Sequence, residues 1–600
     1  MVHRVHGGAD VPFSTRRFGR VQMEEPAERT DRMKILFYNW VDYLDAEKRG
    51  GGVSVYQRNL IKAFADDPEV DAWFLSSGIS YDLMGDTPRW DRVRYAPSEH
   101  ADRRFEIVNS RVLSPSHYSF GHETQIHCPE TRAAFLDFLK AHGPFDIVHF
   151  NNLEGIPASV LSLKEEYPRT RIVFSLHNYY PVCPQVNLWF QEKENCTDFD
   201  EGRKCAACLP HRVEPSVVRH AGAVAYKLKR AGLKPGTLPF DKAFGKAYAL
   251  TEKARNEAAR FYRGAREVGA FSQKVLAPRS GPDAVNRVEP EPRRLRRRRE
   301  EIVTYLNIHA DRILCVSDRV GKVAEKFGID PDLMETAYIG TLHAQKFADT
   351  VPAESICQPD GTVTLAYLGY MRADKGFFFL LDALEALPPL IARRINLLIC
   401  ARRGPQWAMD RLAALGDKFA SVQHADGYTH DNLDALLAPV DLGIIPVLWE
   451  DNLPQVAIEM HARHIPLITS DLGGARELGN TPEMVFKAGD TDSLHDVLFD
   501  VVAGKIDLEE YWTNARAPTS MQEHADALRA LYRSLLSAPH AEADRPDAAP
   551  DMLQKSQPAP VLPLSDVPGS KNSDPESDTL RRSVTSLDPG RASTQKEGLG

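Results

Sequence analysis

Apolar and polar positions alternate along the first half of the chain in the manner of buried strands and amphipathic helices. MKILFYNW at 33–40 is a short apolar run, and the glycine turn that follows at 50–52 leads into a helical period. DIVHFNN at 146–152 and RIVFSLHNYY at 171–180 are two further strand-like runs with helical connections. Such alternation predicts βαβ units and an open parallel sheet.

The same alternation returns after residue 360 and predicts a second sheet of the same kind. We therefore predict an α/β fold with two Rossmann-like domains. The strand-like runs of the second domain are VTLAYLGY at 363–370, INLLICAR at 395–402, VDLGIIPV at 440–447 and PLITSD at 466–471.

Breaks in the pattern predict the domain limits. Long helix-forming stretches near the middle of the chain indicate a helical insertion, and the Pro- and Ser-rich end has too few large apolar residues to offset chain entropy. The predicted division is a disordered N-terminal segment (1–32), a first α/β domain (33–340) with a cysteine loop (183–208) and a helical insertion (about 211–310), a linker (341–360), a second α/β domain (361–516), a closing helix (517–537) and a disordered tail (538–600).

Composition narrows the class of protein. The 600 residues are 43% hydrophobic and 26% charged, as in soluble globular proteins. A net charge of −9 argues against a general nucleic-acid-binding protein, which needs a broad basic face. We find no apolar run of the roughly 18 residues that a membrane span needs, and the opening residues lack the apolar core of a signal peptide. We therefore expect a cytoplasmic protein.

One stretch of the second domain suits a nucleotide diphosphate sugar. Asp451 lies in the loop after the third strand, and Glu459 lies in the second turn of a helix expected to begin near Pro454. The free amides of Gln455 and Val456 at that helix start could hold a phosphate. The carboxylate of Glu459, one turn further on, could accept two hydrogen bonds from a ribose diol. Asp451 would then lie near the sugar hydroxyls.

Two turns of the same domain support this interpretation. Gly473 and Gly474 lack a Cβ, so backbone there can approach a ligand closely. Lys375 and Gly376 lie on the first strand-to-helix turn, where the lysine can meet a diphosphate. Taken singly, a carboxylate at a helix start is also typical of a solvated partner of the helix dipole, and a turn lysine of an exposed side chain.

Together these segments resemble the retaining glycosyltransferases with the GT-B fold, the glycosyl transferases of group 1. The family has a motif of two acidic residues separated by seven others, the second of them a glutamate, which corresponds here to Asp451 and Glu459. Its Gly-Gly-x-x-Glu segment corresponds to residues 473–477. Its G-R-x-x-x-x-K-G turn corresponds to GYMRADKG at 369–376, and VSDRVGKVAEKFGID, with Ser317, is similar to the strand and helix that end the first domain. The resemblance covers residues 33 to 536 in pieces.

The sequence departs from the family pattern at three places. The first acid is Asp451 where the family more often has glutamate, and the neighbouring Glu450 could compensate. Tyr370 stands where the phosphate-binding arginine usually lies, and Arg372 could reach the same phosphate. CARRG at 400–404 replaces the family's glycine-rich segment. These departures concern nucleotide contacts rather than the fold.

The resemblance implies two domains that face a cleft, a nucleotide-sugar donor and transfer of a sugar, with a hexose expected, to a glycan or lipid-linked saccharide. The family's N-terminal double glycine corresponds to Gly51 and Gly52, and its histidine close to the transferred sugar to His177. Catalysis is expected from His177, Asp451 and Lys375. The residues expected to contact the donor are Gly51, Gly52, Arg372, Lys375, Gln455, Val456, Glu459, Gly473 and Gly474.

The implied chemistry depends on positioning and on stabilising the departing diphosphate, so it requires no metal. Two alternatives stay open. One keeps the fold but changes the reaction to nucleotide-sugar epimerisation or phosphorolysis. The other is a non-catalytic scaffold, which Tyr370 and the CARRG segment would suit.

Four of the eight cysteines lie within 26 residues of the first domain. Cys205 and Cys208 form a C-x-x-C pair, and Cys183 and Cys196 complete a set of four sulfurs suited to one tetrahedral ion. We predict a structural zinc site that orders a polar loop. The alternatives are four unrelated thiols, a redox dithiol or disulfides, and an iron–sulfur cluster; a cytoplasmic setting disfavours disulfides.

The arginine run at 293–299 is the most basic segment of the chain. It could contact anionic lipid headgroups, which would suit a lipid-linked acceptor and peripheral membrane contact. A solvated helix face is the simpler interpretation.

Overall fold

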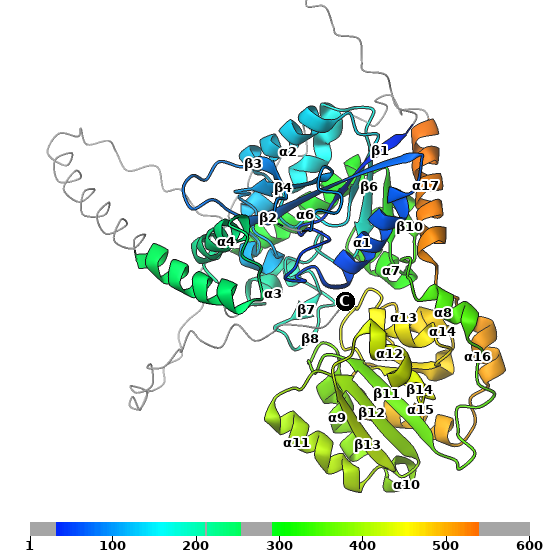
Figure 1. The fold of residues 1–600 in the computed structure, drawn as a ribbon. Coiled ribbons are helices and arrows are strands. Elements are labelled where there is room, and N and C mark those ends of the chain that lie inside the picture. Colours follow the sequence, from blue (N-terminus) through cyan, green and yellow to red (C-terminus); the bar gives the residue numbers. More distant parts are fainter. Residues whose placement is uncertain (1–31, 96, 210–212, 254–290, 539–600) are drawn as a thin grey trace, which may run out of the picture.

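The structure is a computed structural model that describes residues 32–95, 97–209, 213–253 and 291–538 (Figure 1). The predicted disordered segments, 1–32 and 538–600, lie almost entirely outside the described residues. Among the helices of the described ranges, none is both long and apolar enough to cross a bilayer.

The first domain is built on an eight-stranded sheet in the order β10-β9-β6-β5-β1-β2-β4-β3. Its strands pair in parallel except for β3, which is antiparallel to β4. The strands span Met33–Tyr38 (β1), Val70–Ser80 (β2), Arg89–Arg92 (β3), Arg104–Val108 (β4), Ile147–Phe150 (β5), Arg171–Leu176 (β6), Arg312–Cys315 (β9) and Met334–Thr336 (β10).

Both faces of this sheet are buried, which explains why its strands are nearly continuous apolar runs. Leu36 and Tyr38 of β1 pack into one core, whereas Ile35 and Phe37 pack into another on the opposite face. The helices of this domain are α1 (Gly51–Ala65), α2 (Pro129–His142), α3 (Arg203–Ala206), α4 (Pro215–Arg230), α6 (Glu291–His309) and α7 (Asp318–Lys326), and a small hairpin is formed by β7 (Trp189–Phe190) and β8 (Glu194–Asn195).

The second domain has a six-stranded parallel sheet in the order β13-β12-β11-β14-β15-β16. Numbered along the domain this order is 3-2-1-4-5-6, which is that of a dinucleotide-binding Rossmann sheet. The strands span Val363–Gly369 (β11), Ile395–Ala401 (β12), Ser421–Asp426 (β13), Leu442–Ile445 (β14), Leu467–Ser470 (β15) and Val485–Phe486 (β16). Its helices are α8 (Ala344–Asp349), α9 (Phe377–Ala386), α10 (Pro389–Ala392), α11 (Gln406–Ala414), α12 (His430–Leu437), α13 (Gln455–His461), α14 (Arg476–Gly479), α15 (Thr491–Val502) and α16 (Leu508–Asn514), and the closing helix α17 (Met521–Ser537) follows them.

These two sheets confirm the predicted α/β fold with two Rossmann-like domains, the architecture called GT-B. The closing helix α17 returns to the first domain (Figure 1). There Leu528 and Tyr532 pack into the same core as Phe37 and Phe64. The chain therefore crosses between the domains twice.

Within the predicted helical insertion the structure describes α4, a helical stretch at 238–253, and α6. Residues 210–212 and 254–290 lie outside the described residues. α6 is part of the main core rather than a peripheral addition, because Ile302 and Leu306 are buried in it.

Only part of the arginine run at 293–299 is a solvated face, because Arg293 and Arg296 are exposed whereas Arg298 and Arg299 are buried. Arg298 is buried and donates to Oε1 of Gln125 at 2.5 Å and to the Tyr180 carbonyl at 2.9 Å. Arg296 pairs with Glu201 and Glu300, and Arg297 with Glu123. These protein contacts use most of the charge that a lipid surface would need.

Candidate functional site

The strand order of the second domain reverses between β11 and β14, and open α/β sheets bind ligands beyond the carboxyl ends of the strands at such a point. The loops after these two strands carry Lys375 and Asp451. Nζ of Lys375 lies 2.6 Å from Oδ2 of Asp451 and 5.0 Å from the centre of the Trp449 ring. Asp451 is only 7% exposed. The structure thus brings two residues predicted from separate motifs into one ion pair.

Gly376 fixes the loop that carries Lys375. Its φ of +71° is in the left-handed region, and a Cβ added there would lie 1.5 Å from the carbonyl oxygen of Pro446. Only glycine permits this approach of the two loops. The Leu448 amide also donates to the Asp374 carbonyl at 3.1 Å, so the loops are joined by backbone contacts beside the ion pair.

The structure gives Arg372 a partner other than the predicted phosphate site. Its Nε and Nη2 each lie 2.9 Å from the carboxylate of Asp374, and its side chain is 61% exposed. Tyr370, which replaces the family's arginine, is 44% exposed. In the CARRG segment, the Arg403 amide donates to Oδ1 of Asp426 at 2.8 Å.

Glu450 cannot readily compensate for the shorter acid at position 451. Its buried carboxylate forms a two-pronged ion pair with Arg319, with Nε of Arg319 2.8 Å from Oε2. It also accepts from the Gly473 amide at 3.1 Å. Because Arg319 belongs to α7 of the first domain, Glu450 is an interdomain contact.

Gly473 and Gly474 pack against protein backbone. A Cβ on Gly473 would lie 2.3 Å from the carbonyl oxygen of Asp451, and one on Gly474 would lie 2.3 Å from that of Asn452. The Ser317 hydroxyl donates to the same Asn452 carbonyl at 2.9 Å. The double glycine therefore holds the Asp451 loop in place, and no ligand contact is needed to explain it.

Glu477 of the same family motif also has a structural partner. Its carboxylate accepts from the amides of Asp318 at 2.9 Å and Arg319 at 2.7 Å, which cap the start of α7. The Tyr338 hydroxyl donates to it at 2.7 Å. This carboxylate joins the two domains.

Glu459 lies in the second turn of α13, as predicted, and is 3% exposed. Tyr428 donates its hydroxyl to Oε2 at 2.9 Å, and burial raises the pKa of this glutamate above its ordinary value. Nε2 of His343 lies 3.9 Å from Oε1. Among the described residues, His343, His430 and Glu459 form the one group of three potential ligand atoms within 4.8 Å of one another.

The predicted residues of the first domain lie at the corresponding reversal of its sheet, between β1 and β5. α1 begins at Gly51, and a Cβ on Gly52 would lie 3.4 Å from Cγ of Gln455, the first residue of α13. The start of α1 thus faces the start of α13 across the domain interface. Val456, the next residue of α13, was predicted from the same pattern.

His177 follows β6 directly. Its Nε2 lies 3.0 Å from Oδ1 of Asn151, and its ring centre lies 5.0 Å from that of Tyr56. Burial, with a smaller contribution from His524, lowers the pKa of His177 to about 3, so the imidazole is neutral at pH 7. Because an amide oxygen only accepts, Nε2 donates to Asn151 and Nδ1 is left as an acceptor.

Sequence reasoning missed several residues of this region. Arg319, Tyr428 and Asn151 contact predicted residues, yet the segments quoted for Arg319 (316–330) and Asn151 (146–152) indicated only the fold, and Tyr428 lies in no quoted segment. Arg319 and Glu450 are separated by 131 residues, so their pairing leaves no local signal.

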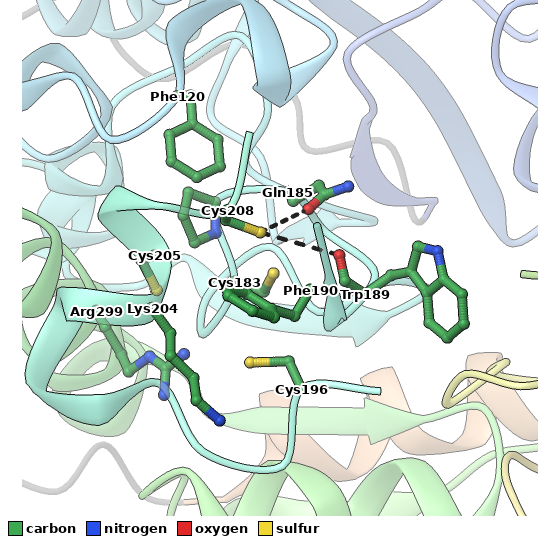
Figure 2. Close-up of a pocket in the computed structure, with 11 residues that line it drawn as sticks. Phe120, Cys183, Gln185, Trp189, Phe190, Cys196, Lys204, Cys205, Cys208 and Arg299 are labelled. Carbon is green, nitrogen blue, oxygen red and sulfur yellow. Dashed lines mark hydrogen bonds between the residues drawn. The ribbon is translucent and has the colours of Figure 1, made fainter. Parts of the chain in front are cut away.

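The four cysteines of the loop after β6 line one small cavity, together with Phe120, Gln185, Lys204 and Arg299 (Figure 2). All eight cysteines lie in the described ranges, and none of them forms a disulfide. Among the described residues, no three of the clustered sulfur atoms lie within 4.8 Å of one another. The thiol of Cys208 donates to Oε1 of Gln185 at 3.0 Å.

Comparison with known proteins identifies the second domain. Residues 362–503, which are most of the second domain, match the family Glycosyl transferases group 1. No curated protein sequence matches the chain.

Several solved structures have a similar fold. Sucrose-phosphate synthase from Thermosynechococcus elongatus is 14% identical, with a TM-score of 0.46, over 84% of this chain and 99% of that one. Anabaena HepE in complex with UDP is 13% identical, with a TM-score of 0.45, over 84% of this chain and 100% of that one. An α,α-trehalose-phosphate synthase (UDP-forming) from Burkholderia vietnamiensis is 13% identical, with a TM-score of 0.45, over 85% of this chain and 100% of that one. With TM-scores below 0.5, these likenesses carry no information on the activity of this chain.

Proposed function

We propose that the protein is a retaining glycosyltransferase that moves a sugar, expected to be a hexose, from a nucleoside diphosphate donor to a hydroxyl of a glycan or lipid-linked saccharide. The contact between Lys375 and Asp451 carries this proposal. It combines a cation suited to phosphate with a carboxylate suited to sugar hydroxyls, at the strand reversal of the domain that matches the family. A lipid-linked acceptor would add peripheral membrane contact to a cytoplasmic location.

In this proposal the donor lies between the starts of α1 and α13. Glu459 accepts hydrogen bonds from the ribose diol, in place of the one from Tyr428. The diphosphate takes Lys375 from Asp451, aided by the amides of Gln455 and Val456 and by the open backbone at Gly51 and Gly52. Asp451 is then free to accept from a hydroxyl of the donor sugar.

Transfer proceeds by exchange of one bond at the anomeric carbon. The bond from that carbon to the diphosphate oxygen breaks while the bond to the acceptor oxygen forms on the same face, and the acceptor proton passes to the departing diphosphate. Lys375 stabilises the charge that grows on this leaving group. His177, neutral and oriented by Asn151, accepts from a sugar hydroxyl through Nδ1.

A screen of purified protein against common nucleotide sugars tests the proposal. Release of the nucleoside diphosphate, together with a mass increase of the acceptor, is the expected result. Calorimetry should show nucleoside diphosphate binding that weakens in Glu459→Ala by about 10-fold or more, since a charged hydrogen bond contributes about 1.5–3 kcal/mol. The exposed Glu509→Ala serves as the control.

Other outcomes separate the alternatives. Binding without turnover on any donor would favour a non-catalytic scaffold, for which the commitment of Arg372 to Asp374 is the supporting observation. An inverted sugar without transfer would favour epimerisation, and phosphate-dependent cleavage would favour phosphorolysis. No binding of any nucleoside diphosphate would contradict the proposal.

A further inference from the structure

The cysteine cluster and the buried end of the arginine run meet in one place. Cys183 lies in the turn after β6, Cys196 follows β8, Cys205 is in α3 and Cys208 ends the C-x-x-C turn. Figure 2 shows their sulfur atoms around a common cavity. The cavity has a volume of about 10 Å³, which is room for about one water molecule or ion. Arg299 lines the same cavity.

Arg299 is an unusual side chain for such a position. It is 5% exposed, and its guanidinium lies 3.7 Å from the centre of the Phe199 ring and 4.7 Å from that of Phe327. Its Nη1 is buried and has no hydrogen-bond partner among the described residues. The two rings face the guanidinium but do not accept the Nη1 hydrogens, and a buried charged donor without an acceptor is costly, so this position calls for an anion.

Among the described residues that line the cavity, none is a carboxylate that could fill that role. Of the residues around it, the four cysteines are the groups able to become anionic, and Lys204 adds a second cation. Four neutral thiols would leave Arg299 uncompensated. Four thiolates on a divalent ion carry a net charge of −2, which the charges of Arg299 and Lys204 balance.

We propose that Cys183, Cys196, Cys205 and Cys208 bind one zinc ion as four thiolates, with Arg299 as the buried hydrogen-bond donor and charge partner of the cluster. Binding releases the four thiol protons to solvent. The thiols close on the ion when it binds, since sulfurs around tetrahedral zinc lie about 3.8 Å apart, and Cys208 then gives up its contact with Gln185.

The site has a structural consequence for the second domain. The hairpin β7–β8 lies between Cys183 and Cys196, and its Asn195 reaches Oε1 of Glu450 at 3.5 Å. The Thr197 carbonyl accepts from Nζ of Lys326 at 2.8 Å. Zinc therefore anchors a segment that touches the interdomain ion pair. The inference does not depend on the proposed transferase activity.

Metal analysis of the full chain, purified without added metal, tests the site directly. One zinc per chain is expected, and Cys205→Ser/Cys208→Ser should lose it. Cobalt(II) in place of zinc should give the absorption bands of a tetrahedral thiolate complex. Protein that holds no zinc and gives no such bands with cobalt would overturn the proposal, as would the visible spectrum of an iron–sulfur cluster.

The role of Arg299 needs its own comparison. Competition with a chromophoric chelator should show zinc affinity lowered about 10- to 100-fold in Arg299→Met, with partial recovery in Arg299→Lys. Arg293→Met, which removes an exposed charge from the same helix, is the matched control. Equal affinity in Arg299→Met and Arg293→Met would overturn the assignment of Arg299. If Arg299→Met does not fold, the zinc affinity of Arg299→Lys is the test. A zinc affinity of Arg299→Lys equal to that of the parent would overturn the assignment of Arg299.

Discussion

Two neighbouring carboxylates have different partners and therefore different tasks. Glu450 is fixed by Arg319 and the Gly473 amide, whereas Asp451 has a single lysine whose side chain is 27% exposed. A diphosphate carries more negative charge than one carboxylate, so it can displace Asp451 from Lys375. The pair seen in the structure is thus suited to opening when a donor enters.

Replacing Lys375 tests this at the scale of one side chain. Lys375→Ala should lower turnover about 10²- to 10³-fold, because the growing charge on the departing diphosphate loses its cation. It should also lower the melting temperature, because Asp451 is left buried without a partner.

A double variant separates these two effects. Lys375→Met/Asp451→Asn removes both charges and should recover most of the melting temperature without recovering turnover. Activity equal to that of the parent in Lys375→Ala would place the phosphate contact elsewhere.

At the scale of elements, the loop after β11 depends on one glycine. Gly376→Ala must place a Cβ within 1.5 Å of the Pro446 carbonyl oxygen, in addition to adopting a positive φ. Gly504 has a similar φ of +68° with nothing within 4 Å, so Gly504→Ala carries the conformational cost alone.

We expect Gly504→Ala to lower the free energy of unfolding by about 1–2 kcal/mol and Gly376→Ala by about 1–3 kcal/mol more. Urea unfolding of the two variants gives the difference. Equal destabilisation would mean that the two loops can separate without loss, contrary to their tight packing.

The closing helix α17 is joined to the first domain by histidines. Nδ1 and Nε2 of His149 lie 2.6 Å from the Tyr532 hydroxyl and 2.7 Å from the Ser175 hydroxyl, and Nε2 of His524 lies 2.8 Å from the Tyr56 hydroxyl. Burial lowers the pKa of His149 to about 3 and that of His524 to about 4. Both side chains are held as neutral imidazoles.

This predicts an acid-sensitive fold. In the unfolded chain His149 has a pKa near 6.5 and binds a proton below that pH, whereas in the folded protein it stays neutral down to about pH 3. The free energy of unfolding is therefore undiminished above about pH 6.5 and falls as the pH decreases toward 3. At pH 5 the loss is on the order of 2 kcal/mol. Melting temperatures from pH 7.5 to 5 should fall, and less steeply in His149→Asn; parallel curves would contradict the assignment.

At the scale of the whole molecule, local patterns predicted the sheets but not the contacts between domains. Apolar runs and turn glycines are local, so both sheets and the positions of Lys375 and Asp451 could be predicted. Arg299 could not be placed from composition, because a run of arginines usually indicates solvent or lipid contact. The helical spacing of the segment did contain a signal, because positions 295, 298, 299 and 302 fall on one face of α6. That face, with Leu295, Arg298, Arg299 and Ile302, is the buried one.

The pair of Arg319 and Glu450 is where the two domains depend on each other most directly. Glu450 is buried in the second domain, and its charge is balanced from α7 of the first. Arg319→Met leaves that carboxylate unpaired at the interface, so we expect the domains to separate, with a larger radius of gyration in small-angle scattering and lower turnover. Arg319→Met/Glu450→Gln has no unpaired charge and should recover compactness, with a coupling energy of about 0.5–3 kcal/mol between the two sites.

Arg411 provides the control for this cycle, because it pairs with Asp382 and Glu385 on the surface of a single domain. Exposed pairs contribute about 0–1 kcal/mol, so Arg411→Met should change neither the radius nor the turnover. If Arg319→Met kept the radius of the parent, Glu450 would have to be satisfied from within its own domain, and the interface would then be held by the Ser317, Glu477 and α17 contacts alone.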